Sequence, residues 1–208
     1  MPDTRRTQTI NPESASPGDL YKLLIGSVLP RPIAFVSTLS PAGVRNLSPF
    51  SFFTVVSANP PIVYFCPIVS STGKAKDTLT NIRATKEFVV NVVSEDFLPQ
   101  MNQCSAEFPP EIDEFTESGL TAIPSQIVQP PRVAESHIHM ECVLHQIVEV
   151  SSNPQGGSLV LGEVKLFHVA DHLLHNFAID LAKLQAVGRM AGSTYARTTD
   201  LFDVTRPQ

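Results

Sequence analysis

The sequence predicts a mainly β protein, a β-barrel with a few peripheral helices, and three features point to it. Short segments rich in Val, Ile, Phe and Thr alternate with turn residues, a pattern typical of many short strands. Few stretches show helical spacing. The 18 prolines outnumber the 10 glycines, and some stand in pairs that forbid helix and mark extended segments. These pairs are Pro60-Pro61, Pro109-Pro110 and Pro130-Pro131. Closure into a barrel would remove exposed strand edges.

The predicted strands follow one another along the chain. They are expected at residues 33–39, 52–57, 62–66, 88–93, 137–150 and 158–169. Ser40 to Gly43 has proline second and glycine fourth, which predicts a turn, and the chain returns from Val44. Within 137–150 the alternation slips at Gln146-Ile147, which indicates a bulge or bend. Residues 153–157 predict a hairpin loop.

Three helices are expected between and after these strands. Residues 78–85 show helical spacing after Asp77, which is the predicted N-cap. The two other predicted helices span residues 96–104 and 172–186.

The composition predicts one domain in a reducing compartment. A chain of 208 residues with 42% hydrophobic residues buries a sufficient core without metal or disulfide. Cys66, Cys104 and Cys142 are too scattered for a disulfide framework, so we expect a cytoplasmic protein. We expect a flexible arm at residues 1–16, the domain at 17–198 and a tail at 199–208.

Charge and hydropathy exclude several classes of protein. The formal net charge of -5 argues against a general nucleic-acid binder. No uncharged apolar stretch is long enough for a spanning helix, so no membrane association is expected. The polar first residues do not read as a secretory signal.

The segment Arg45 to Phe53 is polar and interrupted by proline, although it lies among apolar strands. Asn46, Ser48 and Ser51 offer hydrogen-bonding side chains, and Pro49 interrupts any ladder. Such a segment fits the edge of a flat heteroaromatic ligand. The alternative interpretation is a serine-rich loop with local turn bonds.

The segment Ser70 to Thr78 combines hydroxyls, a glycine and two lysines before a predicted helix start. Free N–H groups and the helix dipole favour an anion there, so a phosphate is one interpretation and a solvated turn the other. It is not a P-loop, because Ala75 follows Lys74. The absence of a G-x-G-x-x-G motif argues against a Rossmann domain.

Two further groups of residues have alternative interpretations. His137, His139 and Glu141 alternate along one strand and form a metal-site candidate, or simply the wet face of a barrel strand. The glycine-flanked segment 187–197 either covers a ligand or ends the preceding helix. None of the cysteines stands in a recognisable nucleophile signature.

Taken in order, several motifs resemble the flavin reductase-like family, and its flavoredoxin-type members in particular. The similarity covers about Tyr21 to Arg197. The motifs that carry it are residues 29–38, 46–53, 57–61, 76–78, 81–82, 87–91 and 188–195. The resemblance implies an FMN-binding split barrel.

The resemblance also implies which residues bind FMN. The ring and ribityl chain would lie along one segment, formed by Asn46, Leu47, Ser48, Pro49, Phe50 and Ser51. The phosphate end would be held by Lys76, Asp77 and Thr78, with Ser71 as a weaker candidate. Arg189 and Tyr195 would contact the flavin or a dimer face.

The function implied is an FMN-dependent oxidoreductase, with NAD(P)H as co-substrate. No catalytic side chain is expected, because hydride passes directly between nicotinamide and flavin. Family members are usually homodimers, with a possible electron-accepting protein partner. The alternatives are an FMN-binding electron carrier without efficient NAD(P)H oxidation and a metal-dependent barrel enzyme. A proline-rich insertion at residues 107–110 would shape access to the flavin.

Overall fold

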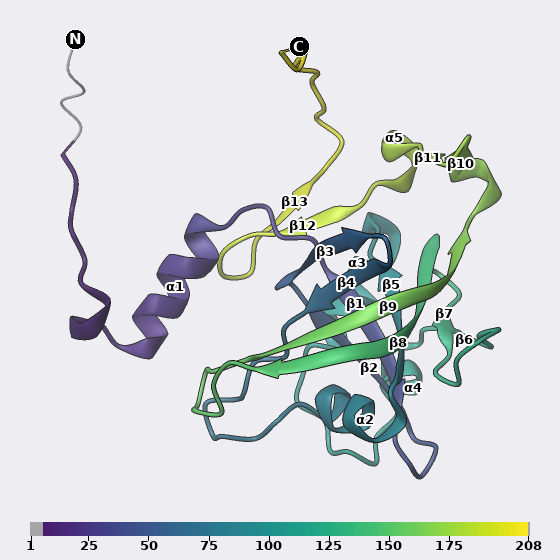
Figure 1. The fold of residues 1–208 in the computed structure, drawn as a ribbon, viewed down its shortest axis with the longest axis horizontal. Coiled ribbons are helices and arrows are strands. Elements are labelled where there is room, and N and C mark those ends of the chain that lie inside the picture. Colours follow the sequence, from purple (N-terminus) through teal and green to yellow (C-terminus); the bar gives the residue numbers. More distant parts are fainter. Residues whose placement is uncertain (1–5, 208) are drawn as a thin grey trace.

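A seven-stranded antiparallel sheet forms the body of the molecule (Figure 1). The structure, a computed structural model, describes residues 6–207. The strand order is β2-β1-β5-β8-β9-β4-β3. The strands are β1 Ala34–Leu39, β2 Arg45–Phe50, β3 Phe53–Ala58, β4 Pro61–Phe65, β5 Glu87–Val92, β8 Ile138–Glu149 and β9 Ser158–Val169.

The sheet curves strongly without closing. Its two edges, β2 and β3, follow each other in the chain but do not pair. The barrel is therefore split between them, and the predicted mainly β split barrel is confirmed. Three small ladders are added to it: β6 Ala122–Ile123 with β7 Arg132–Val133, β10 Leu174–His175 with β11 Ala178–Ile179, and β12 Val187–Arg189 with β13 Tyr195–Arg197.

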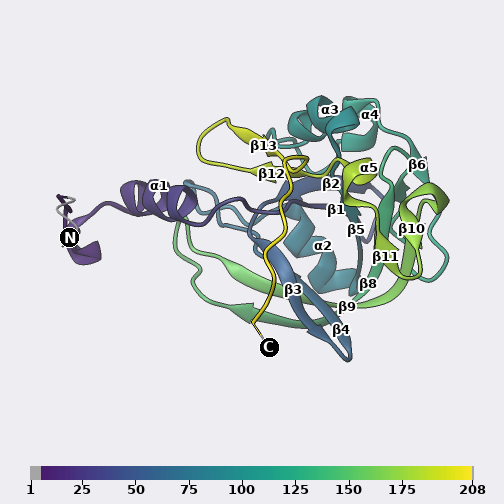
Figure 2. The same ribbon diagram turned by 90° about the horizontal axis from the view of Figure 1, so that it is seen from above.

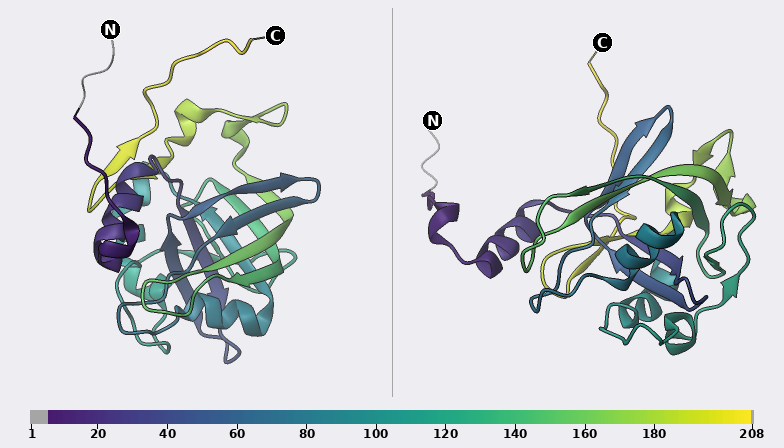
Figure 3. Two further views of the ribbon diagram at one scale, coloured as in Figure 1. Left: turned by 60° about the vertical axis from the view of Figure 1, so that its left-hand side comes forward. Right: turned by 60° about the horizontal axis from the view of Figure 1, so that its bottom comes forward.

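The helices lie around this sheet. Figures 2 and 3 show α2 within its curve, with α3 and α4 beyond β1 and β2, while α1 projects away from the barrel. The helices are α1 Pro17–Ser27, α2 Asp77–Thr85, α3 Leu98–Gln103, α4 Glu114–Ser118 and α5 Leu181–Leu184. Single 3-10 turns occur at Pro12–Ser14, Glu95–Phe97 and Asp171–Leu173. Among residues 6–207, no helix is long and apolar enough to cross a membrane.

Two separate cores lie on opposite faces of β1 and β2. Inside the curve, Phe65 packs between Phe50 and Phe88, with ring centroids 4.9 and 5.5 Å away. Gly162 is required there, because an added Cβ would lie 2.2 Å from the Phe88 ring. The second core joins β1 and β2 to α3 and α4, and includes Phe35, Leu47, Phe97, Met101 and Phe115. Because both faces of β2 are buried, a shift of its pairing by one residue would disrupt both cores, so the register of β2 is strongly specified.

All six predicted strands are present, with ends within one residue of those expected. The predicted helix at 78–85 is α2, and the one at 96–104 is a 3-10 turn followed by α3. A register shift between Leu144 and Gln146 confirms the bend expected in the long strand, and a second shift occurs at Glu141.

Some predictions are wrong. The expected helix at 172–186 is instead the β10–β11 hairpin followed by α5, because Asn176 and Phe177 take positive φ angles that end any helix. Asp77 is the first helical residue rather than the N-cap, which is Lys76. Of the two interpretations of segment 45–50, the serine-rich loop is wrong, because these residues form strand β2 and return along β1 as expected from Val44.

Two helices, α1 and α4, were not predicted. The start of α1 has an ordinary signal, since Ser16 Oγ accepts from the N–H of Asp19 at 3.1 Å and Pro17 opens the helix.

The terminal arm and tail stay predictions. The expected flexible arm at 1–16 and tail at 199–208 fall partly on residues 1–5 and 208, outside the described residues.

Candidate functional site

Three adjoining hollows form a continuous groove along the edge strand β2. The first and second share Ser48 and Lys76, and the second and third share Pro49, Ser51 and Ser105. Their cavity volumes are about 50, 200 and 240 Å³. Each is smaller than an ordinary ligand pocket, which spans roughly 300–1,000 Å³, but the three together form one elongated site.

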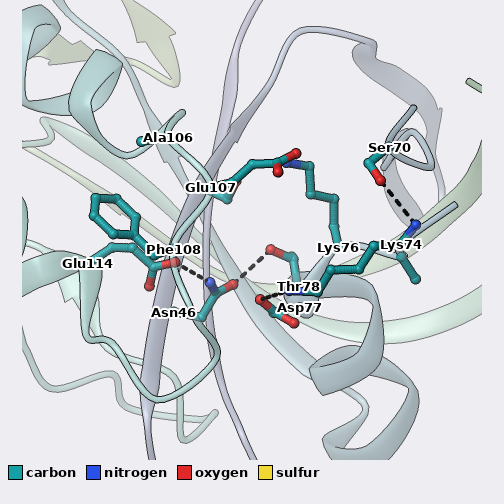
Figure 4. A pocket seen from close by; sticks show the side chains of 12 residues that line it. Asn46, Ser70, Lys74, Lys76, Asp77, Thr78, Ala106, Glu107, Phe108 and Glu114 are labelled. Atoms are coloured by element: carbon teal, nitrogen blue, oxygen red, sulfur yellow. Dashed lines mark hydrogen bonds and ion pairs between the residues drawn. The ribbon is translucent and has the colours of Figure 1, made fainter. Parts of the chain in front are cut away.

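Asn46 and Thr78 are joined at the base of the first hollow (Figure 4). Thr78 Oγ1 donates to Asn46 Oδ1 at 2.8 Å, and Thr38 Oγ1 donates to the same oxygen at 3.2 Å. This bond connects the start of α2 directly to β2. The two sequence segments expected to hold opposite ends of one ligand therefore meet in space.

The start of α2 presents a half-buried lysine and free backbone donors to the first hollow. Lys76 has no ion-pair partner among residues 6–207, and its side chain extends toward Glu107 in Figure 4. The N–H groups of Asp77 and Thr78 also have no acceptor among these residues. The helix dipole adds to this positive end, so the hollow suits an anion such as phosphate.

A buried carboxylate, Glu114 of α4, lies behind Asn46. Its Oε1 accepts from Asn46 Nδ2 at 2.7 Å, and its Oε2 accepts from the Leu47 N–H at 3.1 Å. Burial raises the pKa of the Glu114 carboxyl above its ordinary value, against the lowering effect of these bonds, and nearby Asp77 adds to the rise. Glu114 therefore fixes the amide of Asn46 and is not itself a ligand group.

The middle of the groove follows the outer edge of β2. The N–H of Leu47 points away from β1, toward Glu114, so by alternation Pro49 also faces outward, where its missing N–H costs no ladder bond. The Leu47 side chain is fully buried in the second core and lines none of the hollows. Phe50 belongs to the first core, although it also borders the second hollow.

Ser48 and Ser51 are the polar side chains of the middle part. The Ser48 hydroxyl has no hydrogen-bond partner among residues 6–207, although its backbone belongs to the β1–β2 ladder. Ser51 accepts from Arg31 Nε at 3.4 Å, which leaves its own proton free for a ligand. Serine hydroxyls in these positions can bind the polar edge of a flat ligand.

The far end of the groove is formed by the β12–β13 hairpin and α3. The Arg189 guanidinium lies 4.5 Å from the centre of the Tyr195 ring, and the Tyr195 hydroxyl donates to Asn102 Oδ1 at 3.0 Å. Both Arg189 and Tyr195 line the third hollow, together with Ser51. They therefore lie in the same groove as the other expected site residues.

One expected site residue lies outside the groove, and others were missed. Ser71 is exposed and lines none of the three hollows, whereas its neighbour Ser70 lines the first. The residues that sequence reasoning did not assign to the site include Tyr21, Asn102, Ser105 and Glu114. Their spacing gives no signal, because they reach the groove from separate elements. The expectation that insertion 107–110 borders the site is supported by Glu107.

The structure does not support the metal hypothesis at His137, His139 and Glu141. No group of three or more metal-ligating side chains occurs among the described residues. The Glu141 carboxylate is fully buried and already accepts four donors: the N–H groups of Gln126, Ile127 and Val128, and His168 Nε2 at 2.6 Å. His139 is also buried, with its Nε2 at 2.8 Å from the Val133 carbonyl oxygen. The wet-face interpretation is wrong for His139 and Glu141 as well, because residues of the segment 126–133 cover them.

Comparison with known proteins gives a family and several relatives. The model of the flavin reductase like domain matches residues 25–183. A protein of Halalkalibacterium halodurans that is described as uncharacterized is 41% identical to this chain, over 95% of this chain and 96% of the length of that relative.

Two solved structures also resemble this chain closely. Nitrilotriacetate monooxygenase component B from Bacillus cereus superposes with a TM-score of 0.92, at 35% identity, over 97% of this chain and 100% of its own. Pseudomonas fluorescens 2-nitrobenzoate 2-nitroreductase NbaA superposes with a TM-score of 0.87, at 32% identity, over 96% of each chain.

Proposed function

Because the chain belongs to the flavin reductase-like family, we propose that it is an FMN-dependent oxidoreductase that accepts hydride from NADH or NADPH. One observation carries this proposal: β2 and the start of α2 line a single groove, joined by the Asn46–Thr78 hydrogen bond. The groove has an anion-binding end, a middle lined by hydroxyls and a wider far end, the order of parts needed for FMN.

The residues fit FMN in their chemistry. Lys76 and the free N–H groups of Asp77 and Thr78 would hold the phosphate, because charge-assisted hydrogen bonds are the strong ones. Ser48 and Ser51 would orient the ribityl chain and the ring edge. When bound, FMN supplies the hydride and electron chemistry, and the protein contributes orientation and electrostatics. No catalytic acid or base is assigned to the chain.

The names of the two solved relatives bear on the electron acceptor. One is a monooxygenase component and the other a nitroreductase. We propose that electrons leave this protein for a second molecule, either free flavin, a protein partner or a small oxidised substrate. The three free thiols suit the cytoplasm, where reduced nicotinamides occur.

We propose a homodimer, supported by the apolar surface of α1. None of its residues is buried, and Leu23 and Leu24 of the helix are exposed, as is the C-cap residue Val28. Contiguous exposed apolar residues on a projecting helix are typical of an interaction face. Sedimentation equilibrium would test this, and a monomer at micromolar concentration would contradict it.

The experiment that tests the function is a spectrum followed by a rapid reaction. The purified protein, reconstituted with FMN, should show a flavin absorbance, and anaerobic NADH or NADPH should bleach it within seconds. A bound flavin that does not bleach within minutes would make this an electron carrier reduced by another protein. A protein that fails to bind FMN would refute the proposal.

Ser51→Leu tests the placement of the ring. A leucine at the corner after β2 should fill the groove and abolish FMN binding, while the unfolding transition stays close to that of the wild type. Ser71→Leu is the matched control, since Ser71 is exposed and lines none of the hollows. Equal FMN binding by the two variants would place the ring elsewhere.

A further inference from the structure

Arg31 is a buried arginine at the junction of three segments. It is 5% exposed, and its Nη1 atom donates to the carbonyl oxygens of Ile25 at 2.6 Å and Val28 at 3.0 Å. Its Nη2 atom donates to the carbonyl oxygen of Met190 at 2.9 Å, and its Nε atom to Ser51 Oγ at 3.4 Å. One guanidinium thus joins the end of α1, the β12–β13 hairpin and the corner after β2.

The charge of Arg31 is not compensated by any carboxylate among the described residues. All four of its acceptors are neutral oxygens. Three other arginines have an acidic partner: Arg45–Asp113, Arg83–Glu149 and Arg197–Glu95. Arg132 and Arg189 also donate to carbonyl oxygens, but both are less buried than Arg31. Burial lowers the pKa of the Arg31 guanidinium, yet an arginine keeps its proton at neutral pH. The carbonyl oxygens at the C-terminal end of α1 offset part of this charge, but no carboxylate neutralises it, so we expect a ligand that uses the remaining charge.

The position of this charge relates it to the groove. Arg31 lines a fourth hollow of about 470 Å³, which shares Ser51, Phe52 and Cys66 with the second hollow of the groove. The Arg31 Cζ atom lies 5.9 Å from the centre of the Phe52 ring. The cation therefore faces apolar walls next to Ser51, where water screens its field less than at the surface.

Resting on the function proposed above, we propose that Arg31 is a positioning residue that fixes Ser51 and places an uncompensated positive charge beside the ring end of the flavin. Reduction of the flavin adds negative charge to the ring. A fixed cation in a poorly screened site stabilises that charge at no cost in reorganisation. Arg31 therefore strengthens the binding of reduced FMN relative to oxidised FMN.

The test compares Arg31→Gln with Arg31→Lys. Glutamine can still donate to the neighbouring carbonyl oxygens but carries no charge, whereas lysine keeps the charge and loses the planar fork. Dissociation constants for oxidised and dithionite-reduced FMN are measured by titration, alongside the midpoint potential. Arg31→Gln should weaken the binding of reduced FMN about tenfold more than the binding of oxidised FMN. For a two-electron couple, this change corresponds to a fall of ~30 mV in the midpoint potential of the bound flavin. In Arg31→Lys, the ratio of the affinity for reduced FMN to the affinity for oxidised FMN should stay within about threefold of the wild-type ratio.

The outcomes separate this inference from the function on which it rests. A wild-type protein that binds no FMN refutes the function. If the wild type binds FMN and Arg31→Gln leaves the affinity ratio unchanged, the inference alone is refuted. It is also refuted if the affinity ratio falls equally in Arg31→Gln and Arg31→Lys, because Arg31 would then act only as a structural clamp.

A second pair of variants avoids any folding defect at the buried position. Thr54 of β3 is exposed and lines the same hollow as Arg31. Thr54→Glu introduces a counter-charge and should lower the ratio about threefold relative to Thr54→Gln. Equal ratios in this pair would also overturn the inference.

Discussion

Two buried carboxylates, Glu141 under the segment 126–133 and Glu114 behind the groove, show how differently one side chain can be used. Glu141 accepts three backbone N–H groups and a histidine. Burial opposes its ionised form, but together these bonds hold the pKa of the Glu141 carboxyl below its ordinary value. Glu114 accepts one side-chain amide and one N–H, and burial raises the pKa of its carboxyl.

The difference lies in the number of donors that replace water. A buried carboxylate stays ionised when enough N–H groups replace its hydration, and it tends toward the neutral form when they do not. Glu141 secures a loop that lines none of the three hollows of the groove, and it therefore serves the fold. Glu114 holds Asn46 in the groove, so its removal should affect both the stability of the fold and the geometry of the site. Its effect on stability should be smaller than that of removing Glu141.

The largest effect is expected when the Glu141 contacts are removed. Glu141→Ala leaves three N–H groups and His168 without their acceptor, so the free energy of unfolding should fall by about 3–5 kcal/mol. Urea denaturation measures this. Glu163→Ala on β9 is the matched control: its ion pair with Lys165 is partly exposed and should contribute at most ~1 kcal/mol. Similar losses in both variants would contradict the role given to the donors.

An intermediate effect is expected at Lys76, in the first hollow of the groove. Lys76→Ala should weaken FMN binding by about 1.5–3 kcal/mol, because it removes a charge-assisted contact, without changing the free energy of unfolding of the apoprotein. Isothermal titration measures the affinity. Lys183→Ala carries the same charge change at α5, where the lysine pairs with Asp180, and should bind FMN as the wild type does. If Lys76→Ala has unchanged affinity, the phosphate lies elsewhere.

The smallest effect, and the one that separates the two acids, concerns Glu114. Glu114→Gln should lower the free energy of unfolding by about 1 kcal/mol at neutral pH. An amide nitrogen then replaces one of the two carboxylate oxygens that accept from Asn46 Nδ2 and the Leu47 N–H. The raised pKa means that the folded state holds a proton that the unfolded state releases above about pH 4.5. The stability of the wild type relative to Glu114→Gln should therefore decline as pH rises from 4.5.

Glu141 should show the opposite sign. Its lowered pKa contributes stability that is present above the unfolded value and lost as pH falls through the folded value. Unfolding curves for wild type, Glu114→Gln and Glu141→Ala from about pH 3 to about pH 7 measure both slopes, that of Glu141 below pH 4.5 and that of Glu114 above it. Parallel curves for the two variants would remove the distinction drawn between the acids.

The local parts of the fold were predictable because their signals are local. The strand alternation at 158–169 and the proline-containing turn at Ser40–Gly43 depend only on neighbouring residues, and both are present. The failed helix at 172–186 shows the limit of such signals. Its leucines have helical spacing, but Leu173 and Leu184 instead join a small core with Ile138, across the positive-φ turn at Asn176 and Phe177.

The groove was predictable only in part, for a related reason. Ordered motifs placed residues 46–51 and 76–78 together, and the structure joins them through Asn46 and Thr78. Glu114 has no such local signal, and although Arg31 stands in the motif 29–38, that motif does not place it beside the groove. Glu114 lies 68 residues from its partner Asn46, and Arg31 lies 159 residues from Met190.

The amino-acid order by itself determined the strands, the turns and the family, because side-chain alternation, backbone restriction by proline and ordered motifs act within a few residues. The tertiary structure alone decided where the barrel splits and which buried charges receive partners. Those outcomes depend on the solvent excluded and the donors supplied by distant segments, quantities that exist only once the chain is packed.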